Sequence, residues 1–331
     1  MHNNWKPIIQ LIQKAEYILL TTHVNPDGDG IGSELAMYRV FKKMNIRAEI
    51  INSSPLPDEY SFLDKDNVIR QYNPEQDGAR LGKFDLVIIF DVGGVTRTGI
   101  LGDDLTRHNI PCICIDHHPE NHIVCDEKIV DSKAPATTCI VLELIREIGD
   151  YIDYDIAEAI YVGLMTDTGS FRFENTTRNT FRVAADLLEY GIKPNEIYNR
   201  IYESYTPARM SMLGTVLKSI RYESDGRLAW FKITQSDLKN EGASINEIGG
   251  FTDFVRSIKG VEVSVMFLEV REGQTRVNFR SKGRVIVNEI ARKFGGGGHY
   301  YAAGLTLHKP IAETIELVLP ELRKTITKID I

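Results

Sequence analysis

The sequence IPCICIDHHPENH (residues 110–122) joins an apolar run to a cluster of polar side chains. The apolar run ending at Ile115 predicts a buried β-strand, and Asp116, His117 and His118 follow it directly. An acid and two imidazoles are costly to bury, so a buried strand ending in them is explained if they bind something there. We therefore expect a functional site at the end of this strand.

Three other segments also carry acids next to an expected strand or helix. They are HVNPDGDGIGS (23–33) after an apolar run, LVIIFD (86–91), and GLMTDTGSFRF (163–173) after a helical pattern. Their candidate site residues are His23, Asp27, Asp29, Asp91 and Asp167. Because the carboxyl ends of parallel strands meet at the ligand-binding edge of an open α/β sheet, we expect these side chains to converge.

The first part of the chain alternates short apolar runs with longer helical patterns, which predicts a parallel sheet with crossover helices. Strands are expected at 17–22, 48–51, 86–90 and 111–115, and helices at 6–14, 31–44, 137–148, 156–165 and 179–190. Glycines 28, 30 and 32 are expected to let the loop after the first strand turn tightly beside the acids and to bring backbone N–H groups near an anion.

The pattern changes beyond residue 190. Residues 194–220 read as one or two helices, followed by alternating strands at 227–233, 261–270 and 275–280. The 331-residue length is also more than one core usually occupies. We expect an α/β domain with a parallel sheet over 1–190, a helical linker over 191–220 and a smaller α+β domain over 221–331.

Composition limits the function. The net charge of −7 argues against a general affinity for long nucleic acid, including long duplex DNA. No apolar run reaches the roughly 18 residues of a membrane span and no signal-peptide layout is visible, so we expect a cytoplasmic protein without a membrane partner. The four cysteines fit reduced thiols better than a disulfide framework. Cys112 and Cys114 could begin a zinc site, although the chain has no CxxC.

The acids and imidazoles together suggest a metal site. Each motif alone has a plainer explanation, since an isolated Asp-Gly-Asp is usually an ordinary turn and a lone buried histidine usually a core residue. Carboxylates brought this close repel one another, and a divalent cation resolves the conflict. Mixed Asp and His ligands without Cys suit Mn²⁺ better than Mg²⁺. Two ions about 3.5–4 Å apart, sharing a carboxylate, would suit phosphoryl transfer.

The set of motifs resembles a known family. HVNPDGDGIGS, DVGG, DHHPENH and TDTGSFRF, followed by NFRSKG and FGGGGHYYAAG, resemble the DHH phosphoesterases with a C-terminal DHHA1 domain, in the same order. The two-domain length is most similar to the bifunctional oligoribonuclease and pAp (3′-phosphoadenosine 5′-phosphate) phosphatase group, also described as exopolyphosphatase-related.

The resemblance implies roles for these residues. One ion would be held by His23, Asp27 and Asp91, and a second by Asp29, Asp91, His117 and Asp167. Asp91 would bridge the two ions, Asp116 would orient a neighbouring ligand, and His118 would face the phosphate. Mn²⁺ is the expected metal, with Mg²⁺ or Co²⁺ as alternatives.

The second domain would hold the substrate. Four consecutive glycines leave backbone N–H groups open to an anion, and an arginine at a strand end offers a two-pronged contact to phosphate. A glycine run alone would indicate a flexible loop, but the match to the DHHA1 pattern favours binding. The expected binding residues are Arg280, Ser281, Gly296, Gly297 and His299, with Arg97 and Arg172 as lesser candidates for phosphate contacts or plain surface residues.

The expected substrates are pAp and RNA oligomers of about two to five nucleotides. A cyclic-dinucleotide or linear-dinucleotide phosphodiesterase and a single-strand exonuclease are the alternatives, while the glycine motif argues against a family II inorganic pyrophosphatase. The physiological substrate, the cleavage polarity and the oligomeric state, including a homodimer, stay open from the sequence.

Overall fold

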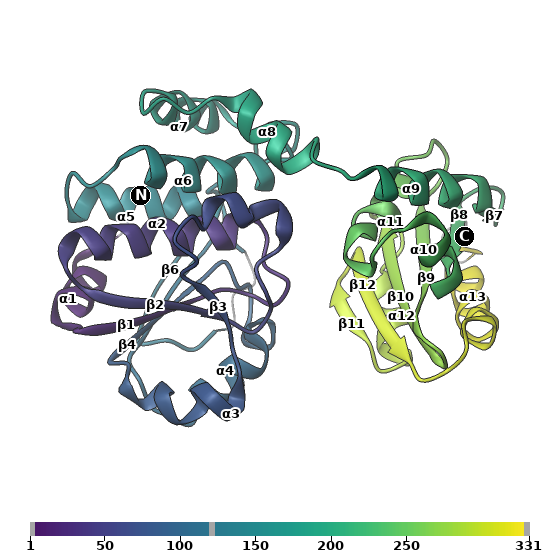
Figure 1. Cartoon of the computed structure of the whole chain (residues 1–331), viewed down its shortest axis with the longest axis horizontal. Coiled ribbons are helices and arrows are strands. Elements are labelled where there is room, and N and C mark those ends of the chain that lie inside the picture. The colour runs from purple at the N-terminus through teal and green to yellow at the C-terminus, as the bar shows by residue number, and fades with distance from the viewer. Residues whose placement is uncertain (1–3, 119–122, 328–331) are drawn as a thin grey trace. The chain divides into compact units, whose positions relative to one another are not determined.

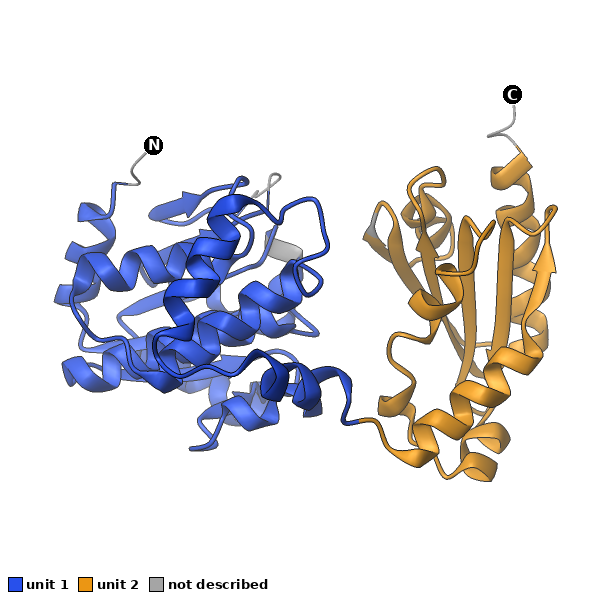
Figure 2. Cartoon of the chain, turned by 90° about the horizontal axis from the view of Figure 1, so that it is seen from above, with its two compact units in different colours: residues 1–204 blue, residues 205–331 orange. Residues whose placement is uncertain are grey.

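The computed structural model describes residues 4–118 and 123–327. Residues 119–122 of the DHHPENH motif therefore lie outside the described residues. The chain folds into two compact units, Met1–Ser204 and Tyr205–Ile331 (Figure 2). Within the expected linker, the helix α8 (Pro194–Tyr202) belongs to the first unit and α9 (Pro207–Ser219) to the second.

The first unit contains a six-stranded parallel sheet (Figure 1). Its strands are β1 (Tyr17–Thr21), β2 (Arg47–Asn52), β3 (Ile69–Gln71), β4 (Leu86–Phe90), β5 (Cys112–Asp116) and β6 (Glu127–Val130). Their order across the sheet is β3-β2-β1-β4-β5-β6, so the direction of strand addition reverses between β1 and β4. Ligands of open α/β sheets bind at such a reversal, outside the carboxyl ends of the strands.

Helices cover both faces of this sheet (Figure 1). The larger core packs one face against α1 (Lys6–Lys14), α2 (Gly28–Met44), α5 (Thr137–Ile148) and α6 (Tyr154–Asp167), with α7 (Arg178–Leu188) and α8 outside them. A smaller core fills the other face, which carries α3 (Pro74–Asp77) and α4 (Gly99–Leu105). The strands alternate between the two cores: Ile88 enters the larger and Ile89 the smaller. The expected parallel sheet with crossover helices is confirmed.

The glycines at 28, 30 and 32 have a different role from the expected one. They lie in the first turns of α2, which begins at Gly28 after the cap Asp27, and not in a loop. A Cβ atom at Gly32 would stand 2.3 Å from the carbonyl oxygen of Ala159. The absence of side chains therefore lets α2 pack closely on α6, which brings the acids of the two helices together.

The second unit is a smaller α+β fold, as expected. Its sheet has the order β11-β12-β10-β9-β8-β7, and only the β8 and β9 pair is parallel. The strands are β7 (Arg221–Glu223), β8 (Leu228–Ile233), β9 (Val263–Arg271), β10 (Gln274–Ser281), β11 (Gly297–His299) and β12 (Ala302–Leu307). One core lies under α12 (Val287–Lys293) and α13 (Ile311–Thr327), and the other under α9, α10 (Gln235–Glu241) and α11 (Phe251–Arg256).

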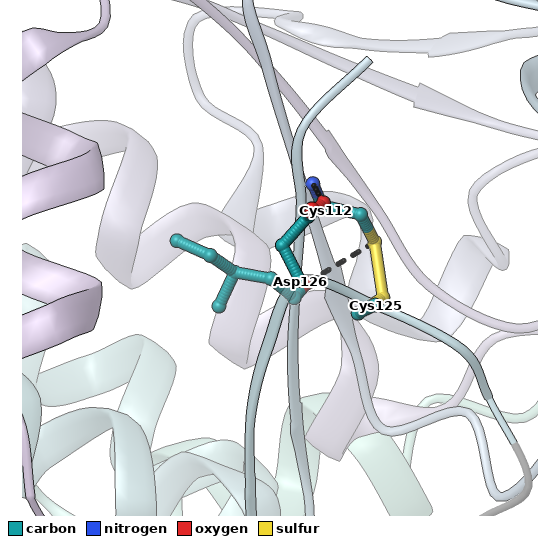
Figure 3. Close-up of a disulfide and its surroundings, with 4 residues drawn as sticks. Cys112, Cys125 and Asp126 are labelled. Atoms are coloured by element: carbon teal, nitrogen blue, oxygen red, sulfur yellow. Dashed lines mark hydrogen bonds between the residues drawn. A yellow bond between two sulfur atoms is a disulfide. The ribbon is translucent and has the colours of Figure 1, made fainter. Parts of the chain in front are cut away.

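Two cysteines differ from the sequence-based expectation of reduced thiols. Cys112 and Cys125 form a disulfide with a Cα–Cα distance of 4.9 Å (Figure 3). β5 and β6 run side by side in the same direction, so the residues at their starts are neighbours, and Cys112 N also donates to Asp126 Oδ2. The expectation was wrong for this pair, because the partner of Cys112 is set by strand pairing. Cys114 and Cys139 are buried and stand outside the disulfide.

The described helices include no segment with the length and apolar character that crossing a membrane requires.

Candidate metal centre

Asp91 lies at the middle of the candidate site, where β4 ends. Its backbone is left-handed, with φ of 52°, and its side chain is buried. One carboxylate oxygen, Oδ2, lies 3.5 Å from His23 Nε2, and the other, Oδ1, lies 3.6 Å from His117 Nε2. The left-handed turn thus directs one carboxylate between two imidazoles that come from different strand ends, which is the arrangement expected of a bridging ligand.

His23 and Asp27 flank Asp91 on the β1 side. Asp27 caps α2 by accepting from the backbone N–H groups of Asp29 and Gly30, which leaves Oδ2 3.7 Å from His23 Nε2. The His23 ring is 3% exposed, and its Nδ1 lies 2.9 Å from the carbonyl oxygen of Val24. Its Nε2 has no hydrogen-bond partner among the described residues. A buried nitrogen without a partner, facing two carboxylates, is suited to a cation.

Asp29 approaches from α2 and is fully buried. Its two oxygens accept from the backbone N–H groups of Thr137 at 2.6 Å and Thr138 at 2.8 Å, at the start of α5. The Thr137 hydroxyl also donates to Asp91 Oδ1 at 3.1 Å. Sequence reasoning missed Thr137 because the segment PATT showed only a helix start, and the contact joins residues that are far apart in the sequence.

Asp116 organises the histidine pair that follows it. Its Oδ1 accepts from the backbone N–H groups of His117 and His118 and lies 2.8 Å from His118 Nδ1, while Oδ2 accepts from Gly93 N. Gly93 has φ of +62°, and a Cβ there would lie 3.2 Å from His118 Cγ. The surrounding hydrogen bonds and His118 outweigh the effect of burial and hold the pKa of Asp116 at about 2. An ionised Asp116 can only accept, so His118 carries its proton on Nδ1.

His117 faces three acids from three elements. Its Nε2 lies 3.9 Å from Asp29 Oδ2, 3.6 Å from Asp91 Oδ1 and 3.5 Å from Asp167 Oδ2. Its Nδ1 lies 3.3 Å from the carbonyl oxygen of Ala134, which fixes the ring orientation. Asp167 is the last residue of α6 and not part of the loop after it. The ring therefore points one nitrogen at the carboxylates.

These side chains form three overlapping groups whose ligand atoms lie within 4.8 Å of one another. The groups are His23, Asp27 and Asp91; Asp29, His117 and Asp167; and Asp91, His117 and His118. The first and third groups share Asp91, and the second and third share His117. The structure thus brings together all eight residues that were expected to converge, and Asp116 joins the three groups through its contact with His118.

The charges of the cluster are not balanced by its own residues. Burial, together with the charges of Asp91 and Asp167, raises the pKa of Asp29 well above its ordinary value. Burial also raises the pKa of Asp167 to about 6, with Asp91 adding to the effect and His117 opposing it. Burial would lower the pKa of His23, but attraction to Asp27 and Asp91 raises it to about 10. Without a cation, Asp29 and Asp167 therefore hold a proton more readily than an ordinary aspartate does.

Divalent cations fit this donor set. Ligand atoms around one ion are roughly 3–4 Å apart when each bond is about 2.0–2.2 Å long, and the distances between carboxylate and imidazole atoms here are of that size. His23 Nε2 is the clearest indication, because this buried nitrogen lacks a hydrogen-bond partner among the described residues and lies 3.5 Å from Asp91 Oδ2, a spacing that an ion between them would fill. The oxygen and nitrogen donors suit a borderline metal.

The two candidate arginines of the first unit differ in position. Arg97, at the end of a short 3₁₀ helix Val95–Thr98, has Nη1 3.4 Å from His118 Nε2. Arg172 is exposed, and its Nε donates to the carbonyl oxygen of Gly169. Arg97 therefore lies in the candidate site, whereas the described contact of Arg172 holds its own loop.

The candidate binding residues of the second unit lie around the end of β10. Arg280 is partly exposed, and its Nε donates to Asp253 Oδ2 at 3.1 Å. Ser281 is 1% exposed; its hydroxyl donates to Glu262 and accepts from two backbone N–H groups. Gly296 precedes β11, and Gly297 lies in it opposite Gly304. His299 is the last residue of β11, and its side chain lies outside the described part of the structure.

Comparison with protein families assigns both halves of the chain. Residues 17–164 match the DHH family, N-terminal domain, and residues 231–329 match the DHHA1 domain. The first match contains seven of the eight cluster residues, up to His118, and the second contains the β10 and β11 motifs.

Individual relatives cover nearly the whole chain. The bifunctional oligoribonuclease and PAP phosphatase NrnA of Thermus thermophilus is 34% identical over 317 residues, which are 94% of this chain and 90% of the relative. The protein of the same name from Bacillus subtilis is 30% identical and covers 91% and 92%. Among solved structures, an exopolyphosphatase-related protein from Bacteroides fragilis has a TM-score of 0.87 at 26% identity, over 97% of each chain.

Proposed function

Because the chain belongs to the DHH family of phosphoesterases and carries a DHHA1 domain, we propose that it hydrolyses short oligoribonucleotides to mononucleotides and pAp to AMP. The observation that carries this proposal is the overlap of three ligand groups through Asp91 and His117. Relatives named bifunctional oligoribonuclease and PAP phosphatase extend over both units, which supports the same pair of substrates here.

DHH family enzymes are metal-dependent, and the acidic and histidine groups could bind metal. We propose two divalent ions, with Mn²⁺ preferred over Mg²⁺ and Co²⁺. His23, Asp27 and Asp91 would hold one, and Asp29, Asp91, His117 and Asp167 the other. When bound, such ions lower the pKa of a water molecule and offset the charge of a phosphate.

The remaining residues of the cluster would act on the substrate. Asp116 fixes the proton of His118 on Nδ1, so Nε2 is the end available to a substrate, beside the Arg97 guanidinium. We propose that Arg97 and His118 face the phosphate, where His118 stabilises charge on an oxygen or protonates the leaving group.

In this proposal the domain over residues 1–190 carries out hydrolysis. The linker over 191–220 connects it to the domain over 221–331, which binds the rest of the substrate. Arg280, with its guanidinium oriented by Asp253, would contact a phosphate or base, and Gly296, Gly297 and His299 would offer donors nearby. The Ser281 hydroxyl already bonds to Glu262 and to two backbone N–H groups of the turn that follows it, so its proposed role is to shape the backbone beside Arg280. Arg172 is a lesser candidate for a contact to the phosphate.

The test is a substrate comparison with purified protein and Mn²⁺. We expect release of AMP from pAp and stepwise conversion of RNA of about two to five nucleotides to mononucleotides. A length series up to about twenty-five nucleotides, a cyclic dinucleotide and pyrophosphate complete the set. Turnover that rises with length would indicate an exonuclease, and a strong preference for the cyclic dinucleotide would reassign the protein to that class.

A further inference from the structure

One buried carboxyl group of α2 is not among the candidate metal ligands. Glu34 is on α2, one and a half turns after Asp29, and its side chain is fully buried. Its Oε2 accepts from Asn52 Nδ2 at 2.9 Å, while Oε1 has no hydrogen-bond partner among the described residues. An acid in this environment is costly to retain unless it serves a contact that an apolar residue cannot make.

Asn52 connects Glu34 to the end of β1 through hydrogen bonds. It is the last residue of β2 and is fully buried. Its Oδ1 lies 3.1 Å from Thr22 N and 3.2 Å from Thr21 Oγ1, both of which donate to it. An asparagine amide can rotate to exchange its oxygen and nitrogen. Because Glu34 accepts from the nitrogen, the oxygen is held facing the β1 donors.

The chain of hydrogen bonds ends next to two candidate ligands. The Thr22 hydroxyl donates to the carbonyl oxygen of Phe90 at 2.8 Å. Thr22 is followed by His23 and Phe90 by Asp91, so the contacts join the ends of β1 and β4 at the reversal of strand order. The 3.5 Å separation of His23 Nε2 and Asp91 Oδ2 depends on how these two strand ends are held together.

We propose that Glu34 is a positioning residue for the metal centre, which orients the Asn52 amide and so keeps His23 and Asp91 at the spacing that one ion requires. This inference rests on the proposed metal site and not on the identity of the substrate. Burial raises the pKa of Glu34 to about 8, outweighing the hydrogen bond from Asn52, so the group is mainly a neutral acid at pH 7. A neutral acid accepts through its carbonyl oxygen, and a glutamine can do the same.

The first experiment measures Mn²⁺ affinity by the electron paramagnetic resonance signal of free Mn²⁺, without substrate. Glu34→Ala should weaken Mn²⁺ binding by about 10–100-fold, the usual effect of removing a group that orients a ligand. Glu34→Gln should stay within about threefold of the wild type, since its carbonyl replaces the acceptor. Unchanged affinity in Glu34→Ala, or equal loss in both variants, would overturn the inference.

Glu158 provides a matched control. It is a buried glutamate on α6, 1% exposed, whose described partners are Lys65, Tyr154 and Arg200. Glu158→Ala should lower the melting temperature but leave Mn²⁺ affinity unchanged. A loss of Mn²⁺ affinity equal to that of Glu34→Ala would mean that general destabilisation explains both results, against the inference.

An exchange of donor and acceptor tests the contact even if Glu34→Ala does not fold. Asn52→Asp keeps the oxygen that faces Thr22 but replaces the amide donor by a carboxylate, which reverses the contact with the neutral Glu34 and adds a buried charge, so Mn²⁺ affinity should change from that of the wild type and is expected to fall. Adding Glu34→Gln supplies a donor from the other side and should restore most of that affinity. Failure of the double variant to recover would overturn the inference. Wild-type protein that binds Mn²⁺ yet hydrolyses none of the proposed substrates would instead overturn only the proposed function.

Discussion

The two units differ in how well their buried polar groups are hydrogen-bonded. In the first, Asp29, Asp91 and Asp167 crowd around His117, and His23 Nε2 has no hydrogen-bond partner among the described residues. In the second, Ser281 is equally buried, but it donates to Glu262 and accepts from the backbone. The difference teaches that burial of a polar residue does not by itself mark a reactive centre. A buried charge that neighbouring residues do not compensate is a better indication of a reactive centre.

The strongest test of this contrast is to remove the shared carboxylate. Asp91→Asn keeps the side-chain shape and tolerates the left-handed backbone, but removes the charge between His23 and His117. We expect activity to fall by about 10⁴-fold or more, because several kcal/mol of stabilisation depend on metals held at the correct spacing. Metal analysis should show fewer than two bound ions per chain. Two retained ions with near-normal turnover would show that Asp91 does not bridge.

The histidine pair separates metal binding from action on the phosphate. His118→Ala should lower kcat by about 10²–10⁴-fold with metal content nearly intact, as for loss of a group that transfers a proton or stabilises charge. His117→Ala should lose metal, since its Nε2 faces three carboxylates. Metal content and single-turnover rates of both variants are the measurements. Equal metal loss would mean that both imidazoles are ligands.

The second unit should respond differently, through binding. Arg280→Ala should raise KM for dinucleotides by roughly tenfold to a hundredfold, the range for losing a hydrogen bond to a charged group, while kcat changes little. Arg256→Ala is the matched control, because Arg256 also pairs with Asp253. A similar rise in KM for the control would indicate that the local fold, and not Arg280 itself, was disturbed.

A smaller effect is expected at the start of α5. Thr137→Val removes the hydroxyl that donates to Asp91 but keeps the backbone N–H that Asp29 accepts. Mn²⁺ affinity should fall by roughly threefold to tenfold, the value of one hydrogen bond. Thr138→Val is an adjacent control, since the Thr138 hydroxyl has no hydrogen-bond partner among the described residues. Isothermal titration of both variants decides whether the contact to Asp91 matters.

A separate effect is expected on stability, and not on metal binding, as a function of pH. The pKa of Glu34 rises on folding from 4.5 to about 8, so the folded state binds the proton more tightly than the unfolded state. Stability from this group is therefore present below about pH 4.5 and is lost as pH rises toward 8. Without metal, Glu34→Gln should lose less stability than the wild type between pH 6 and 8. Parallel urea-unfolding curves across that range would contradict this.

The sequence predicted the features that depend on local patterns. The apolar runs of β1, β4 and β5 end in residues that converge at the sheet edge, so the sequence alone locates the ligand cluster. The strands β3 and β6 were missed because three or four partly buried residues give no clear alternation. The start of α2 was placed three residues late because its glycines resemble a loop.

Contacts between distant segments could not be predicted. Thr137 and Asp91 are 46 residues apart, and Glu34 and Asn52 are 18 apart on different elements, so no local spacing indicates either pair. The burial of Ser281 was missed for the same reason, since Glu262 lies on a neighbouring segment. The sequence therefore identified the charged groups of the site but not the neutral groups that orient them.

The disulfide gives the molecule a chemical label position at the edge of the sheet opposite the histidine pair. Cys112 and Cys125 are half-buried, whereas Cys114 and Cys139 are buried, so a thiol-reactive dye should modify the native protein mainly at two positions, and only after reduction of the disulfide. A fluorophore attached at either position would sit at the start of β5 or just before β6, about 17 Å along the strand from His117 and His118. Such a probe would label the protein without obstructing the strand ends that carry the candidate metal ligands, and without any engineered cysteine.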